Sequence, residues 1–354
     1  MRLNVTMLNV LVFCGLATLG DGFQRMVYLR KPTLKCRTTL VLYALHLCIL
    51  TKRSFVFPFQ LIPNNHGLFL QIGYDSIAGM LSLAMFLRYD HNKRLKTDLN
   101  HDQNELSESP LPWHVPQKLK PKVTTVALIL LTLYFASGLF AQTYDQILFA
   151  LKTFGLPITD QMHMSLQVLL SHLTWVFMGV NILGTQLPDF FKRESTWYKA
   201  RVGSNWMWWV CGGYFFSSWL FNCADCFNQL ILPGSLFAVD EGVVSKLINP
   251  EVPHILSSLI GYIAPCISAP WWEEILYRGF MLPALSVLMP LKPAIIASGL
   301  VFSIHHLTLT GFLPLAVLGI SWAGIYVASG NLVTTMIIHA MWNSRVFLGG
   351  WMGI

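Results

Sequence analysis

Acidic, basic, imidazole and amide side chains gather beyond residue 270 of this 354-residue chain, inside segments that are otherwise apolar. Ionisable groups are costly in such surroundings, so they mark either a functional site or a paired structural role. A carboxylate can act as a general base toward water, while imidazole and amide groups can donate hydrogen bonds to an anionic oxygen. The polar residues that stand out in these segments are Glu273, Glu274, Arg278, His305, His306, His339 and Asn343.

The spacing of the two glutamates and the arginine predicts which of them form an ion pair. Glu274 precedes Arg278 by four residues, the favoured order for an ion pair on a helix, so we expect the two to pair. Glu273 points about 100° away on the same helix and is left free to act as a base. Pro270 is predicted to begin this helix, which would place both carboxylates in the first turn, near the positive end of the helix dipole.

The last part of the set combines His339 with Asn343. The two are four residues apart and therefore share one face of a helix. A single buried histidine or one ion pair is commonly a packing feature. A spare glutamate, two adjacent histidines and a His/Asn face on three successive segments favour a functional site instead.

The segments that position these residues are predicted to be membrane helices. Hydrophobic residues make up 54% of the chain and charged residues 12%, against about 25% in soluble proteins. The net charge is +7, but the basic residues lie in loops between apolar runs, which is typical of membrane topology signals and does not favour nucleic-acid binding. The chain is therefore expected to be an all-α, polytopic membrane protein with roughly eight to ten spans.

The chain divides into three predicted regions. Residues 1–87 hold N-terminal membrane segments, of which the apolar run at 4–20 is either a first span or part of a signal or targeting leader. Residues 88–122 form a charged, proline-containing linker. Residues 123–354 form the membrane helical domain. Its expected helical segments are Val123–Ala141, Met164–Gly184, Trp206–Phe221, Ile255–Ala269, Trp271–Met289, Ala294–Thr308, Leu313–Ala328 and Leu332–Gly349.

Three motifs in order, EExxxR at 273–278, FxxxH at 302–306 and HxxxN at 339–343, resemble those of the CPBP family of intramembrane proteases. This family includes the type II CAAX prenyl endopeptidases. A glycine-rich stretch from Gly319 to Leu332 also resembles the family, and the likeness covers about 206–345. The sequences that flank the motifs are similar to those of bacterial and plastid members.

The resemblance implies a membrane-embedded endopeptidase. Glu273 would activate water, His306 would help to hold that water, and His339 and Asn343 would steady the oxyanion. His305 has no assigned role. The implied substrate is a membrane-associated protein or peptide, in some relatives a prenylated CAAX protein, and the implied location is an endoplasmic-reticulum or plastid-type membrane.

Two alternatives stay open from the sequence. Some CPBP relatives serve as membrane scaffolds without proteolysis, so a non-catalytic partner-binding protein is the second hypothesis. For the cofactor, Glu273, His306 and His339 could form a three-ligand zinc site. A metal-free glutamate base is favoured, because Asn343, the helical neighbour of His339, is a poor zinc ligand.

Overall fold

The computed structural model describes residues 78–88, 92, 111–187, 189–192, 194–200, 206–237, 243–248 and 254–351. Every regular element among these residues is a helix, which confirms the all-α fold class. The run at 4–20, the other early segments up to 77 and most of the predicted linker lie outside the described residues. The leader, the first spans and the linker therefore stay predictions.

The described helices follow one another along the chain. A first helix covers Ala78–Arg88. The later elements are η1 (Gln117–Leu119), α5 (Lys120–Thr153), α6 (Asp160–Gln186), α7 (Trp206–Ile231), α8 (Gly234–Phe237), α9 (Val243–Ile248), α10 (Ile255–Ile263), η2 (Ala264–Ser268), α11 (Ala269–Glu274), η3 (Ile275–Met281), α12 (Leu282–Leu288), α13 (Leu291–His305), α14 (Phe312–Ser329) and α15 (Leu332–Trp351).

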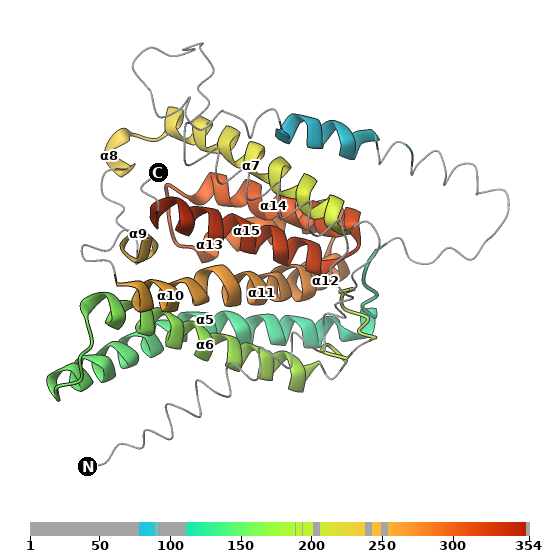
Figure 1. Cartoon of the computed structure of the whole chain (residues 1–354). Coiled ribbons are helices and arrows are strands. Elements are labelled where there is room, and N and C mark those ends of the chain that lie inside the picture. Colours follow the sequence, from blue (N-terminus) through green and yellow to red (C-terminus); the bar gives the residue numbers. More distant parts are fainter. Residues whose placement is uncertain are drawn as a thin grey trace, which may run out of the picture.

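The elements from α10 to α12 join into one long helix through the middle of the bundle (Figure 1). Helices α5 and α6 pack on one side of it, and α13 and α15 pack on the other side. Helix α14 lies against α13, and α7 covers α14 and α15. This arrangement brings the two segments that carry histidines against the segment that carries the glutamates.

The long helix corrects two predictions. Pro270 lies inside the helix instead of beginning it, and the segments expected at Ile255–Ala269 and Trp271–Met289 are one continuous helix, Ile255–Leu288. The reason is that η2 and η3 are π-helical; in η2 the Ala269 N–H donates to the Ala264 carbonyl, five residues back. Such wider turns admit a proline without ending the helix. Glu273 and Glu274 therefore lie mid-helix, beyond the reach of the terminal dipole.

Four of the described helices are long and apolar enough to cross a membrane: Gln117–Thr153, Asp160–Gln186, Ile255–Leu288 and Phe312–Ser329. Shorter apolar helices cover Ala78–Arg88 and Leu291–His305. Helix α5 has 34 residues and so measures about 51 Å, well above the roughly 30 Å of a bilayer core. The chain is an integral membrane protein. The expected eight to ten spans include segments that the structure does not describe.

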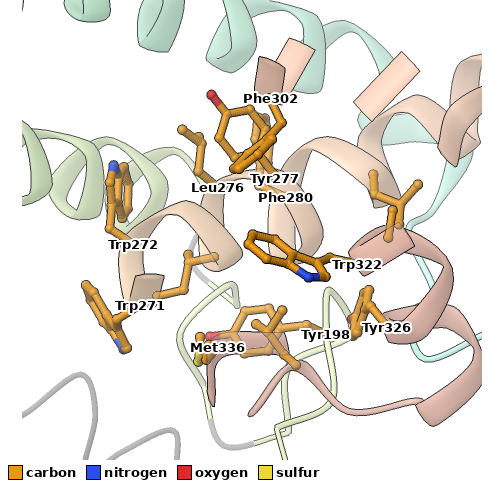
Figure 2. Packing of buried hydrophobic residues seen from close by; sticks show 14 of the residues in the cluster. Tyr198, Trp271, Trp272, Leu276, Tyr277, Phe280, Phe302, Trp322, Tyr326 and Met336 are labelled. Atoms are coloured by element: carbon orange, nitrogen blue, oxygen red, sulfur yellow. The ribbon is translucent and has the colours of Figure 1, made fainter. Parts of the chain in front are cut away.

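One large apolar core joins the whole bundle. It extends from Trp113 through α5, α6 and α7 to Trp342 on α15. Trp113 falls in the region predicted to be a linker, yet it is buried, stacks on Tyr326 and donates from its indole nitrogen to Ser286. Residues 111–119 are therefore packed on the bundle. Figure 2 shows the aromatic centre of this core, where Phe302 of α13 packs against Tyr277 of the long helix and Trp322 of α14.

Helices α13 and α14 cross at backbone contact distance. A Cβ atom added at Gly299 would lie 2.5 Å from the Ile320 nitrogen, and one at Gly319 would lie 2.7 Å from the Gly299 carbonyl oxygen. Small residues at such crossings let membrane helices approach closely. In this arrangement the Gly319 carbonyl of α14 lies within reach of the Arg278 side chain of the long helix.

Candidate active site

Glu274 and Arg278 form the ion pair that their spacing predicts. Arg278 Nη1 donates to Glu274 Oε1 at 2.8 Å, and both side chains are fully buried. Arg278 Nη2 also donates to the Gly319 carbonyl at 2.9 Å. The guanidinium carbon lies 4.8 Å from the centre of the Phe302 ring, where a cation–π interaction adds to its stabilisation. The long helix and α14 are thus joined through one buried cation.

Glu274 has a second partner that spacing could not reveal. Its Oε1 also accepts from His339 Nδ1 at 3.1 Å, across 65 residues of sequence. Because a carboxylate only accepts, Nδ1 carries the ring proton. A carboxylate in this position fixes the orientation of an imidazole and the identity of its protonated nitrogen. The His339 ring is further held by the Trp322 ring, with 4.4 Å between ring centres.

Glu273 is left without a partner, as predicted. It is buried, and its Oε2 receives no hydrogen bond from the described residues. Its nearest polar neighbour in the same cluster is His339, whose Nε2 lies 3.9 Å from that oxygen. This distance is too long for a direct hydrogen bond. The pair therefore presents a carboxylate and a ring nitrogen that both remain available to a third group.

Phe302 links the histidine motifs. Its ring contacts the His306 ring with 4.8 Å between centres and the His339 ring with 6.0 Å. His306 is exposed at the C-cap of α13, one residue beyond the helix in which it was expected. Its Nδ1 donates to the Phe302 carbonyl at 2.8 Å, which leaves Nε2 free to accept.

Asn343 is directed away from the glutamates. Its Nδ2 donates to the Pro265 carbonyl at 2.7 Å. In the π-helical register of η2, this carbonyl would receive the N–H five residues onward, and that residue is Pro270, which has no N–H. The Asn343 amide thus satisfies a carbonyl that Pro270 leaves unpaired. One further N–H of the amide remains for any role at an oxyanion.

His305 packs toward α5 and the long helix, and the centre of its ring lies 5.6 Å from that of the His306 ring. Its ring packs on Tyr134 of α5, with 4.3 Å between ring centres, and on Tyr277 at 5.9 Å. Nothing in the sequence singles out Tyr134 or Trp322, since each is one of several aromatic residues within an apolar helix. Only their contacts with the motif histidines reveal them.

The donor set does not fit a three-ligand metal site. Across the residues with described coordinates, no group of three or more His, Cys, Asp or Glu side chains converges as metal coordination requires. His306 and His339 each use Nδ1 for a protein hydrogen bond and keep Nε2, an arrangement that metal-ligating histidines also have, so these bonds do not exclude a metal. What counts against the zinc ligands considered from sequence is that Glu273, His306 and His339 do not form such a convergent group.

Comparison with known families supports the motif assignment. Residues 255–345 match the family model described as type II CAAX prenyl endopeptidase Rce1-like. No curated protein and no solved structure gives a match to the chain. The matched segment begins with the long helix and ends just after Asn343, so it contains all three motifs and every side chain of the cluster. This match to residues 255–345 supports the resemblance of the motifs to the CPBP family, which includes the type II CAAX prenyl endopeptidases.

Proposed function

We propose that the chain is an intramembrane endopeptidase that hydrolyses a peptide bond of a membrane-associated substrate. The observation that carries this proposal is the unpaired Glu273 carboxylate, buried 3.9 Å from a histidine nitrogen that another carboxylate holds in place. A purely structural carboxylate at this depth would be expected to have a hydrogen-bond partner, as Glu274 does.

Glu273 acts as the general base in the proposed reaction. It takes one proton from water, the water oxygen attacks the carbonyl carbon of the scissile bond, and the proton passes to the leaving amine as the C–N bond breaks. The free Nε2 of His306 accepts a hydrogen bond from the attacking water. The proposed mechanism uses a metal-free glutamate base, which is supported by the lack of a convergent three-ligand group among the described residues.

His339 takes the oxyanion role when it carries a second proton. In that form Nδ1 still donates to Glu274, and the Nε2 proton faces the space beside Glu273 where the oxyanion develops. Donors that are fixed before the reaction stabilise such charge most effectively. The Glu274 hydrogen bond and the Trp322 contact provide that fixation.

A glutamine variant tests the proposal. Glu273→Gln keeps the side-chain shape and removes the base, so we expect cleavage to fall by about 10²- to 10⁴-fold with normal protein level. Glu194→Gln, at an exposed position outside the cluster, is the matched control and should cleave normally. The readout is a comparison of membrane peptides from cells that express the parent, each variant or neither.

Two results decide between the alternatives. A Glu273→Gln protein that cuts as well as the parent would refute the base assignment. Identical peptide patterns for the parent, the variant and cells without the protein would favour the non-catalytic scaffold. A synthetic CAAX peptide with and without its prenyl group then tests the proposed substrate class.

A further inference from the structure

The C-terminal end of α13 determines where His306 lies. An α-helix leaves its last four carbonyls without partners in the helix itself. In α13 these belong to Phe302, Ser303, Ile304 and His305. The chain around His306 satisfies three of them: His306 Nδ1 donates to Phe302, the His306 N–H to Ser303, and the Leu307 N–H to Ile304.

Tyr134 of α5 satisfies the fourth carbonyl. Its hydroxyl donates to the His305 carbonyl at 2.6 Å, and its ring packs against the His305 ring. The peptide group that carries this carbonyl is the one that joins His305 to His306. Tyr134 therefore contacts the backbone immediately before His306, the residue whose imidazole holds the attacking water in the proposed mechanism.

The turn that follows His306 is strained. Leu307 has φ 51°, a left-handed conformation that a residue with a branched side chain rarely adopts. Such a backbone conformation is unfavourable in free energy and persists only where the surrounding structure enforces it. The Tyr134 hydrogen bond and the Leu307 turn lie on either side of His306, so both constrain the position of its ring.

We propose that Tyr134 is a positioning residue for His306, and that the functional unit therefore extends from the Rce1-like segment to α5. The inference rests on the proposed function for its catalytic consequence, although the positioning itself does not depend on that function. Tyr134 lies far outside the matched residues 255–345. It acts through the His305 carbonyl, to which its hydroxyl donates.

The test removes one hydroxyl. Tyr134→Phe keeps the ring contacts and deletes the hydrogen bond; we expect kcat to fall by about 10- to 100-fold with KM unchanged, since small misplacements of a catalytic group have effects of this size. Tyr144→Phe is the matched control: it lies on the same helix, and its hydroxyl bonds Thr174 instead. It should leave both constants unchanged.

A double-mutant cycle separates positioning from a general structural role. If Tyr134 acts through His306, then Tyr134→Phe has no further effect on kcat in the His306→Ala background. An equal loss in both backgrounds would overturn the proposal.

Amide hydrogen exchange provides a readout that needs no activity. In full-length protein, Tyr134→Phe should speed exchange over residues 303–309, whereas Tyr144→Phe should not. Unchanged exchange with unchanged kcat would overturn the positioning role. Faster exchange in a protein whose parent does not cleave would support the positioning and refute the proposed function alone.

Discussion

At the scale of single residues, Glu274 is the side chain on which the site depends. One of its oxygens accepts from both Arg278 and His339, so it neutralises a buried cation and orients an imidazole at once. The first contact could be predicted, because helical geometry fixes which residues four apart can meet. The second could not, because it depends on how α15 packs against the long helix.

The Glu274–Arg278 pair is expected to act on stability. Glu274→Ala or Arg278→Ala leaves an uncompensated charge among fully buried neighbours, which typically costs about 3–5 kcal/mol. Thermal unfolding in detergent should show a lower Tm for both variants. The double variant should recover part of the loss, because neither charge then remains.

Additive losses in this cycle would show that the two side chains do not interact. Arg278 also donates to the Gly319 carbonyl, so some loss should persist in the double variant. Glu274→Gln is the conservative control: its amide oxygen can still accept from His339, so the histidine should stay oriented while the charge is lost.

At the scale of elements, the structure differs from the predicted helix boundaries at the π-helical turns. From sequence, Pro270 reads as the start of a helix, because proline in a regular α-helix removes a hydrogen bond and clashes with the preceding turn. Rules based on neighbouring residues cannot predict the contribution of the Asn343 side chain, which extends from α15 and donates to the Pro265 carbonyl. The continuous helix thus depends on a partner 78 residues away.

Asn343→Ala is therefore expected to destabilise the protein. It leaves a partly buried carbonyl unsatisfied, at a cost of about 1–3 kcal/mol at most, and should lower the Tm in detergent. In a Pro270→Ala background the new N–H of residue 270 can reach the Pro265 carbonyl. Asn343→Ala should therefore lower the Tm by less in that background. A variant with the parent Tm that no longer cleaves would instead support the oxyanion role that the family resemblance implies for Asn343.

The α13–α14 crossing gives a second prediction at this scale. Gly299→Ala places a Cβ 2.5 Å from the Ile320 backbone nitrogen, so α14 must shift, and the Gly319 carbonyl moves away from Arg278. Overpacking of this kind typically costs about 1–3 kcal/mol.

Gly324→Ala, on α14, provides the control. It has no neighbouring atom within 4 Å of the added Cβ and should keep the parent stability or slightly increase it. Equal unfolding temperatures for Gly299→Ala and Gly324→Ala would contradict the role of this crossing.

At the scale of the whole molecule, composition and three motifs predict the fold class, the membrane environment and the family. They do not predict how the residues before the three motifs contribute to the candidate site. Trp113, which precedes the first long span, and Tyr134 on α5 both pack against the segments that carry the site. Contacts of this kind depend on the three-dimensional packing of aromatic residues, which have no distinctive spacing in sequence.

The absence of a convergent ligand set leads to a prediction for the intact protein. Among the described residues, the two available imidazole nitrogens and the Glu273 carboxylate do not gather as three ligands, so the folded state should not depend on a bound metal. Exhaustive chelation of the purified protein, followed by metal analysis, should therefore change neither the Tm nor the rate of cleavage. Metals that stabilise a fold raise its Tm by mass action, so a structural or catalytic zinc would be detected even if its ligands were incompletely known. A loss of cleavage and of Tm that stoichiometric zinc restores would overturn the metal-free mechanism and would require Glu273, His306 and His339 to move together.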